Sequence, residues 1–221
     1  MLRRPDAVPP VSAAWRDSVW TEWLLRAFAL FAYGTMVSIV ARYWWADPGR
    51  LTLLLLLVSE GFTVALLLFA RRAVVRDISP VALLATLLAL TAFLFFEYAS
   101  TLHLVPEWVG IVLMTLGMVW QIVAKATLGR SFGVLPAARG LVTTGPYQVV
   151  RHPIYLGYLI GHLGFLLSNF SWHNLLVLVG LYVAQTLRML REESVLKAGD
   201  QGATYLAYCA AVRFRIVPYL F

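Results

Sequence analysis

Six long apolar runs joined by short polar connections constrain the fold of this chain more than any other feature of its sequence. Residues 154–187 form a stretch without a single Asp, Glu, Lys or Arg. The chain is 61% hydrophobic and only 13% charged, which is about half the charged content of a soluble domain. So much apolar surface cannot be hidden in one small core, and the solvent must therefore be lipid. The sequence predicts an all-α fold, a polytopic bundle of membrane-spanning helices.

Each predicted span is close to the length that crosses a bilayer, although the fourth and fifth are short. The spans cover residues 23–41, 51–70, 81–103, 108–124, 154–167 and 173–190. The last two come from dividing the long uncharged stretch at the polar residues 168–171, which predict a tight helical hairpin. Five spans with a re-entrant or short hairpin are the alternative.

The basic residues predict the orientation of these spans. Of the 18 Lys and Arg residues, 16 fall in the N-terminal segment and first helix turn, the connections after the second and fourth spans, and the C-terminal part. Only Arg42 and Arg50 fall on the other side. Because cytoplasmic connections carry the excess of Lys and Arg, both termini are expected in the cytoplasm. The net charge of +7 then reflects topology, with membrane lipids as surroundings, no nucleic-acid partner and no obligatory protein partner.

Polar residues gather at the predicted start of the fifth span, in the sequence Arg151-His152-Pro153-Ile154-Tyr155-Leu156-Gly157. Pro153 suits the first turn of a helix, where its missing N–H would be unpaired anyway. A helix N-terminus favours anions, so Arg151 and His152 lie at a place suited to a carboxylate or another anion. Gly157 and Gly161, four residues apart, allow another helix or a ligand to approach closely.

A second polar cluster, Arg191-Glu192-Glu193, follows the sixth span and, in the predicted orientation, lies on the same cytoplasmic side. Arg188, Arg191 and Glu192 are spaced to share one helix face. A solvated helix end is one interpretation of this cluster. A functional role is the other, because Glu at a helix C-terminus opposes the helix dipole.

Two further carboxylates, Glu60 and Glu97, lie within or near the end of apolar spans. Intramembrane carboxylates are costly and usually face a partner or a cavity, and we interpret both as structural pairing partners rather than catalytic groups. The single cysteine, Cys209, excludes an intramolecular disulfide and a thiolate metal cluster, and no metal site is predicted.

The second half of the chain carries an ordered set of motifs. They are Leu128-Gly129-Arg130-Ser131-Phe132, Gly140-Leu141-Val142-Thr143-Thr144-Gly145-Pro146-Tyr147, the segment from Arg151 to Gly157, the pair Glu192-Glu193, and the tail with Tyr205-Leu206-Ala207-Tyr208, Val212 and Pro218. In this order they resemble the isoprenylcysteine carboxyl methyltransferase family and the wider group of integral-membrane phospholipid methyltransferases. The resemblance covers residues 110–217, about half of the chain. We therefore divide the chain into N-terminal membrane helices without a recognised motif, residues 1–105, and a methyltransferase-like catalytic region, residues 106–221.

The resemblance implies S-adenosylmethionine as the methyl donor, bound from the cytoplasmic side. It implies that Glu193 or Glu192 holds the ammonium group of the donor and that the loop with Tyr147 covers the adenosine. Arg151 and Arg191 are the implied catalytic residues, as cations that bind an anionic acceptor. The implied cofactor-binding residues are Gln121, Leu141, Val142, Gly145, Tyr147, His152, Tyr155, Gly157, Glu192 and Glu193.

The expected reaction is methyl transfer to a lipophilic acceptor, a small molecule or a lipid, that enters from the bilayer. Methyl transfer is an in-line displacement, so the enzyme mainly has to align the reacting groups. A carboxylate acceptor, such as that of isoprenylcysteine, is already ionised at neutral pH and needs no general base, and a guanidinium can bind it through two hydrogen bonds. Two alternatives stay open: an NADPH-dependent sterol-type membrane reductase, and a non-catalytic membrane carrier or scaffold.

Overall fold

The computed structural model describes residues 19–69, 75–77, 79–99, 102–129, 137–138, 141–199 and 201–220. Over these residues the chain forms seven α-helices, and the predicted all-α class is confirmed. The helices are α1 (Val19–Ala46), α2 (Leu51–Phe69), α3 (Pro80–Thr91), α4 (Glu107–Leu128), α5 (Pro153–Ser168), α6 (Trp172–Ala198) and α7 (Gly202–Ala211). Smaller elements are the 3-10 helices η2 (Ala92–Phe95) and η4 (Gly145–Gln148), and the antiparallel pair β1 (Val75–Arg76) and β2 (Ala137–Ala138).

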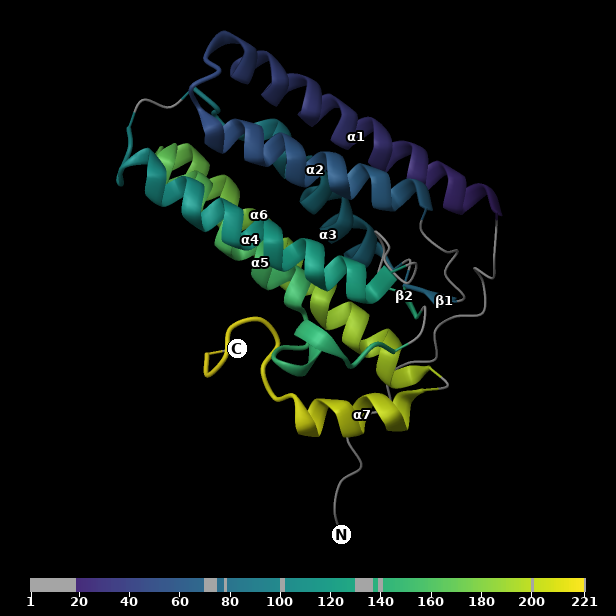
Figure 1. Cartoon of the computed structure of the whole chain (residues 1–221). Helices are drawn as coiled ribbons and strands as arrows, with labels where there is room; N and C mark the ends of the chain where they lie inside the picture. The colour runs from purple at the N-terminus through teal and green to yellow at the C-terminus, as the bar shows by residue number, and fades with distance from the viewer. Residues whose placement is uncertain are drawn as a thin grey trace.

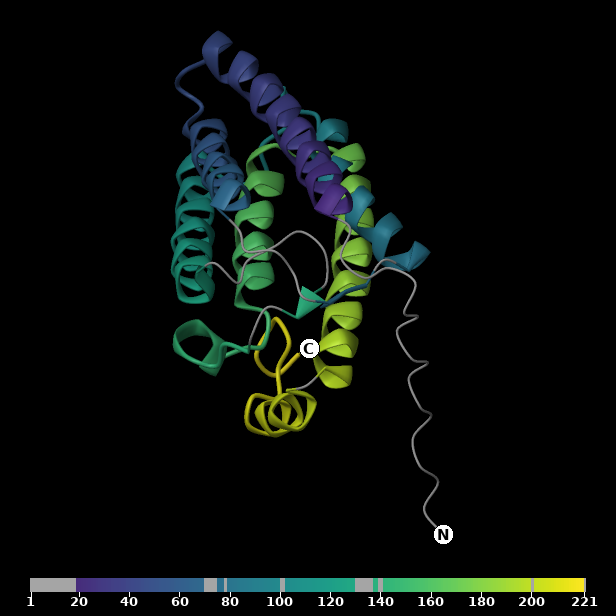
Figure 2. The same cartoon turned by 90° about the vertical axis from the view of Figure 1, so that its right-hand side faces the viewer.

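The long helices form a bundle with the short elements of the second half of the chain at one end (Figures 1 and 2). α1 packs along α2, α2 packs on α4, α4 packs on α5, and α3 packs on α6. α7 lies across one end of the bundle, and β1, β2, η4 and the C-terminal segment gather at the same end (Figure 1). The start of α5 and the end of α6 are therefore surrounded by the short elements of the chain.

Glycines let α4 and α5 pack with their backbones in contact. A Cβ added at Gly117 would lie 2.6 Å from the carbonyl oxygen of Gly157, and one added at Gly157 would lie 2.9 Å from the carbonyl oxygen of Gly117. Two turns further along α5, a Cβ added at Gly164 would lie 2.9 Å from the carbonyl oxygen of Gly110. Contacts this short leave no room for a side chain. The close helix approach expected at Gly157 is confirmed, with α4 as the partner.

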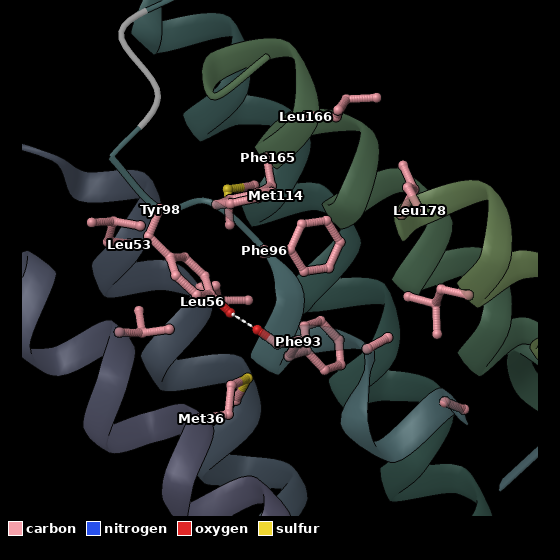
Figure 3. Close-up of a cluster of buried hydrophobic side chains, with 14 residues drawn as sticks. Met36, Leu53, Leu56, Phe93, Phe96, Tyr98, Met114, Phe165, Leu166 and Leu178 are labelled. Carbon is pink, nitrogen blue, oxygen red and sulfur yellow. Dashed lines mark hydrogen bonds between the residues drawn. The ribbon is translucent and has the colours of Figure 1, made fainter. Parts of the chain in front are cut away.

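Buried side chains from α1 to α6 and from η2 form the main apolar core (Figure 3). Its aromatic rings meet at tilted or edge-on angles, with ring centroids 5.4 Å apart for Phe96 and Phe165 and 5.8 Å apart for Phe93 and Phe96. The Tyr98 hydroxyl donates a hydrogen bond of 2.5 Å to the Phe93 carbonyl, so the buried phenol is satisfied (Figure 3). This core joins the N-terminal helices to α5 and α6.

Among the described residues, two helices, α4 and α6, are long and apolar enough to cross a membrane. Shorter apolar helical segments lie at Leu51–Leu66, Pro80–Phe95 and Pro153–Ser168. These lengths and compositions are consistent with a membrane helical protein. The count of six spans and the cytoplasmic position of both termini stay predictions.

The end of the third predicted span was placed too far along the chain. It was expected to reach residue 103, but α3 ends at Thr91 and η2 ends at Phe95. The Asn174 side chain accepts a hydrogen bond of 2.8 Å from the Glu97 N–H and donates one of 3.0 Å to the Glu97 carbonyl. These bonds hold the backbone in a non-helical turn, and the Glu97 side chain is exposed. An apolar run read by composition alone does not reveal such a distant backbone partner.

The polar break in the long uncharged stretch separates α5 from α6, as predicted. Ser171 caps α6, because its hydroxyl accepts a hydrogen bond of 3.0 Å from the Asn174 N–H. Asn169 in the same turn is fully buried and is hydrogen-bonded to Arg50, which follows α1. The turn is therefore anchored to the N-terminal half of the chain.

Candidate functional site

The start of α5 has the local structure that its sequence predicts. His152 is the residue before the helix, and Pro153 occupies the first turn. The backbone N–H groups of Arg151 and His152 donate hydrogen bonds of 2.9 Å and 2.8 Å to the carbonyls of Phe214 and Arg215. The C-terminal segment is therefore attached to the mouth of α5, some sixty residues away in the sequence.

Glu193 is the centre of a buried ion cluster at this point. Its carboxylate lies 3.0 Å from Arg151 and 3.3 Å from His152 Nε2, and Lys197 lies 3.6 Å away. Arg215 bonds both carboxylate oxygens, Nε to Oε1 at 3.2 Å and Nη2 to Oε2 at 3.3 Å. Glu193 itself is 1% exposed. The carboxylate thus joins the end of α6, the start of α5 and the C-terminal segment.

The negative charge of Glu193 is balanced within the protein. A buried carboxylate is costly unless it is paired and hydrogen-bonded, and the Glu193 cluster supplies both conditions. Two of its neighbours, Arg151 and Arg215, carry guanidinium groups that stay charged at any physiological pH. Glu193 was predicted, together with Glu192, as a ligand for the ammonium of the donor. In the structure Glu193 is the residue of the two whose carboxylate joins the end of α6 to the start of α5 and to the C-terminal segment.

Arg151, predicted to bind an anionic acceptor, is also engaged by the protein. Its guanidinium donates to the Cys209 thiol at 3.2 Å and to the Arg213 carbonyl at 3.2 Å, in addition to the Glu193 ion pair. Partial burial would lower the pKa of Arg151, but Cys209 and Glu193 outweigh it and raise the pKa. The side chain therefore connects α5 to α7.

Glu192 has a different environment from its neighbour. Its charge acts on the phenols of Tyr147 in η4 and Tyr155 in α5. Burial raises the pKa of Tyr147, and the Glu192 charge raises it further. Arg188, one turn before Glu192, places its guanidinium carbon 5.9 Å from the centroid of the Tyr155 ring and donates a hydrogen bond of 2.7 Å to Gln185. Glu192 thus shares its surroundings with two phenols and one guanidinium.

Arg191, the second predicted catalytic cation, points to another part of the chain. Its Nε atom lies 2.5 Å from Asp77 Oδ2, and its Nη2 atom lies 2.7 Å from the Ser79 hydroxyl. Partial burial would raise the pKa of Asp77, but the bonds from Arg191 and Ser79 outweigh it and lower the pKa. Arg191 therefore attaches the connection before α3 to α6.

The loop before α5 is fixed by η4 and α7. Gly145 has a φ of +59°, a conformation that glycine adopts without strain. The Tyr147 side chain is buried, and the backbone carbonyl of Tyr147 accepts a hydrogen bond of 2.6 Å from the Tyr208 hydroxyl. Burial raises the pKa of Tyr208 to about 12, so the hydroxyl stays protonated and remains a donor. Leu141 is held by a bond of 3.1 Å from its N–H to the side chain of Gln201.

The other predicted cofactor residues lie on the helices and the loop beside this region. Gln121 on α4 is buried, accepts a hydrogen bond of 3.1 Å from Lys125, and packs on Gly157 of α5. Tyr155 contacts His152, with ring centroids 5.7 Å apart. Val142 is half-buried in the segment before η4.

Four residues of the predicted motifs, Arg130, Ser131, Phe132 and Gly140, lie outside the described residues. Conversely, the sequence interpretation left out Arg188 and Arg215 as site residues. The four-residue spacing between Arg188 and Glu192 was a usable signal for the first. For Arg215 no local signal exists, because its role depends on the docking of the C-terminal segment.

Residues 105–199 match the family of phospholipid methyltransferases. The matched segment contains the whole of α4, α5 and α6 and therefore both polar clusters. The predicted resemblance to the isoprenylcysteine and phospholipid methyltransferase group is confirmed over these residues, and the match supports a membrane methyltransferase in general. A stretch of 61 residues is 44% identical to the cobalt-zinc-cadmium resistance protein CzcN of Cupriavidus metallidurans. It covers 26% of this chain and 27% of that relative, so the two are similar over about a quarter of their lengths.

Proposed function

We propose that this chain is an integral-membrane methyltransferase that uses S-adenosylmethionine and acts on a lipophilic acceptor, with its site facing the cytoplasm. One observation carries the proposal: in the segment that matches the phospholipid methyltransferases, Arg188 lies over Tyr155 and the Glu192 charge acts on Tyr147 and Tyr155, all at one end of apolar helices. The soluble donor would enter from that end and the acceptor from the bilayer.

The residues around Glu192 suit the polar groups of the donor. The amino-acid end of S-adenosylmethionine has an ammonium, which a carboxylate binds, and a carboxylate, which a guanidinium binds. Glu192 and Arg188 supply these two groups one helical turn apart. The sulfonium is a cation, and the faces of Tyr155 and Tyr147 are suited to a cation. We therefore assign the ammonium to Glu192, since Glu193 is already balanced by Arg151, His152 and Arg215.

The proposed mechanism is mainly one of alignment. S-adenosylmethionine supplies a methyl group on a positively charged sulfur. Glu192 and Arg188 fix the amino-acid end, and Tyr147 and Tyr155 limit the positions of the rest. The Glu193 cluster keeps α5, α6 and the C-terminal segment in register, so that these side chains converge. Partial burial of these side chains among apolar helices strengthens each charged contact.

Binding of S-adenosylhomocysteine to the purified full chain tests the proposal. Isothermal titration in detergent should give micromolar binding and no heat with NADPH. Glu192→Gln should weaken binding by about tenfold to a hundredfold, because a hydrogen bond to a charged group is worth about 1.5–3 kcal/mol. Glu97→Gln, the same change at an exposed side chain, is the control and should bind as the parent does.

Other results would favour the alternatives. Binding of NADPH without S-adenosylhomocysteine would replace the proposal with a membrane reductase. If the chain binds neither ligand, the carrier or scaffold would be the remaining interpretation. Normal binding by Glu192→Gln would remove the assignment of Glu192 while leaving the methyltransferase intact.

A further inference from the structure

A second buried polar group, outside the motifs of the candidate site, lies between α2, α4 and α5. Its charged members are Glu60 on α2, which is 2% exposed, and Lys125 on α4, which is fully buried. Thr63 lies one turn after Glu60 and accepts a hydrogen bond of 2.9 Å from Lys125 Nζ. The charge of the Lys125 ammonium also acts on the Glu60 carboxyl. Two opposite charges buried this deeply are costly and need a reason.

The two members differ in how their polar atoms are used. Lys125 Nζ is hydrogen-bonded to Thr63 and Gln121 and lies 4.8 Å from the centroid of the Tyr158 ring. Glu60 Oε2 is buried and accepts no hydrogen bond from any residue that the structure describes. A carboxylate oxygen left in this way loses its hydration without compensation, which is unfavourable. Glu60 Oε2 is therefore an acceptor atom that a hydrogen-bond donor could satisfy.

Tyrosine rings connect this group to the candidate donor site. The Tyr158 ring lies under Lys125, and its centroid is 6.5 Å from that of Tyr155. Tyr155 in turn lies under Arg188 and beside Glu192. Both tyrosines are half-buried, as are Arg188 and Glu192, whereas Lys125 is fully buried. The buried pair and the donor site are thus neighbours along one row of aromatic rings.

The charges restrict what kind of group could bind Glu60 Oε2. A carboxylate or a phosphate would bring a second negative charge against Glu60, and an ammonium would add an unbalanced positive charge to a group whose two charges already cancel. A neutral group with a hydrogen to donate would satisfy the carboxylate oxygen and leave the pair balanced. A hydroxyl on an aromatic ring has this property, and its ring can pack on Tyr155 and Tyr158.

We infer that Glu60 and Lys125 bind the neutral hydroxyl of a lipophilic phenol, which is the methyl acceptor. This inference rests on the proposed methyltransferase function. It selects a neutral acceptor over the carboxylate expected from the sequence.

The reaction step balances with Glu60 as the proton acceptor. The phenol O–H bond breaks, and its proton passes to Glu60 Oε2. The phenol oxygen forms a bond to the methyl carbon of the donor. The carbon–sulfur bond breaks, and its electron pair stays on sulfur, which becomes a neutral thioether. The charge of Lys125 stabilises the negative charge that develops on the phenol oxygen.

Three acceptors with one apolar body and different polar ends test the inference. Full-length protein in phosphatidylcholine nanodiscs is incubated with methyl-labelled S-adenosylmethionine and dodecylphenol, dodecylbenzoate or dodecylbenzylamine. We expect label chiefly in the methyl ether of dodecylphenol. Glu60→Gln should lower this rate at least about tenfold, because its amide cannot take the proton. It should regain activity as the pH rises toward about 10, where a phenol ionises unaided.

Binding of S-adenosylhomocysteine separates the possible failures. Glu60→Gln should bind it normally, which also shows that the variant is folded, and Glu97→Gln should match the parent in every assay. If the parent binds S-adenosylhomocysteine but labels the benzoate or the benzylamine, or none of the three, the acceptor inference is wrong and the proposed function survives. An unchanged rate and pH profile for Glu60→Gln would also overturn it. If the parent binds no S-adenosylhomocysteine, both fail together.

Discussion

Replacing Glu193 with alanine should destabilise this protein far more than replacing its neighbour Glu192. Glu193 is 1% exposed and its carboxylate is shared by Arg151, His152, Lys197 and Arg215. Removing one partner of a buried ion pair costs about 3–5 kcal/mol, because the remaining charge is left without compensation. The side chains of Arg215 and Lys197 are 28% and 40% exposed and can return to water. We therefore expect the lower end of that range, about 3 kcal/mol.

Thermal unfolding of the detergent-solubilised protein, followed by tryptophan fluorescence, measures this cost. For a chain of this size 1 kcal/mol corresponds to about 2–4 °C, so Glu193→Ala should lower the midpoint by about 6–12 °C. Glu193→Gln keeps the size and loses only the charge, and should fall between the alanine variant and the parent. Glu192→Ala is the matched control and should stay within about 3 °C, because Glu192 is half-buried.

Ligand binding gives the second half of the same test. Glu192→Ala should melt normally and lose S-adenosylhomocysteine binding, whereas Glu193→Gln, at a temperature where it is folded, should retain most of it. The assignment of a structural role to Glu193 would be refuted by a Glu193→Ala variant that melts within about 2 °C of the parent and fails to bind. That result would make Glu193 the ligand and the surrounding cations incidental.

Two further predictions concern packing and pH. Gly157→Ala should lower the free energy of unfolding by about 1–3 kcal/mol, because its Cβ would lie 2.5 Å from Gln121 Cγ. Gly161→Ala, whose Cβ would meet nothing within 4 Å, should be neutral or slightly stabilising. Comparison of the melting midpoints of the two variants tests this. The lowered pKa of Asp77 stabilises the fold above its unfolded value of about 3.9, and this contribution is lost as the pH falls through the folded pKa. Asp77→Asn should therefore be less stable than the parent at neutral pH. The loss in free energy of unfolding should be no more than about 1 kcal/mol, because the Arg191 side chain is 40% exposed. In acid the difference in melting midpoint should vanish. A difference that persists in acid would contradict this account.

Most of the fold class could be predicted from the sequence because its signals are local. The apolar runs determine helices in lipid, and Pro153 and the polar turn before Ser171 mark helix starts that the structure confirms. The same signals failed at the third run, where the helix ends at Thr91 and the 3-10 turn at Phe95 because Asn174 binds the backbone of Glu97. Composition records hydrophobicity but contains no information on a partner 77 residues away.

The candidate site shows the same division more sharply. The order of the motifs predicted that the start of α5 and the end of α6 act together, and the ion pairs of Glu193 with Arg151 and His152 join these two segments in the structure. The sequence could not separate Glu192 from Glu193, because adjacent residues have the same neighbours along the chain. On a helix they point about 100° apart. Only the tertiary structure decides that the charge of one carboxylate acts on Tyr147 and Tyr155 while the other carboxylate pairs with Arg151 and the distant Arg215.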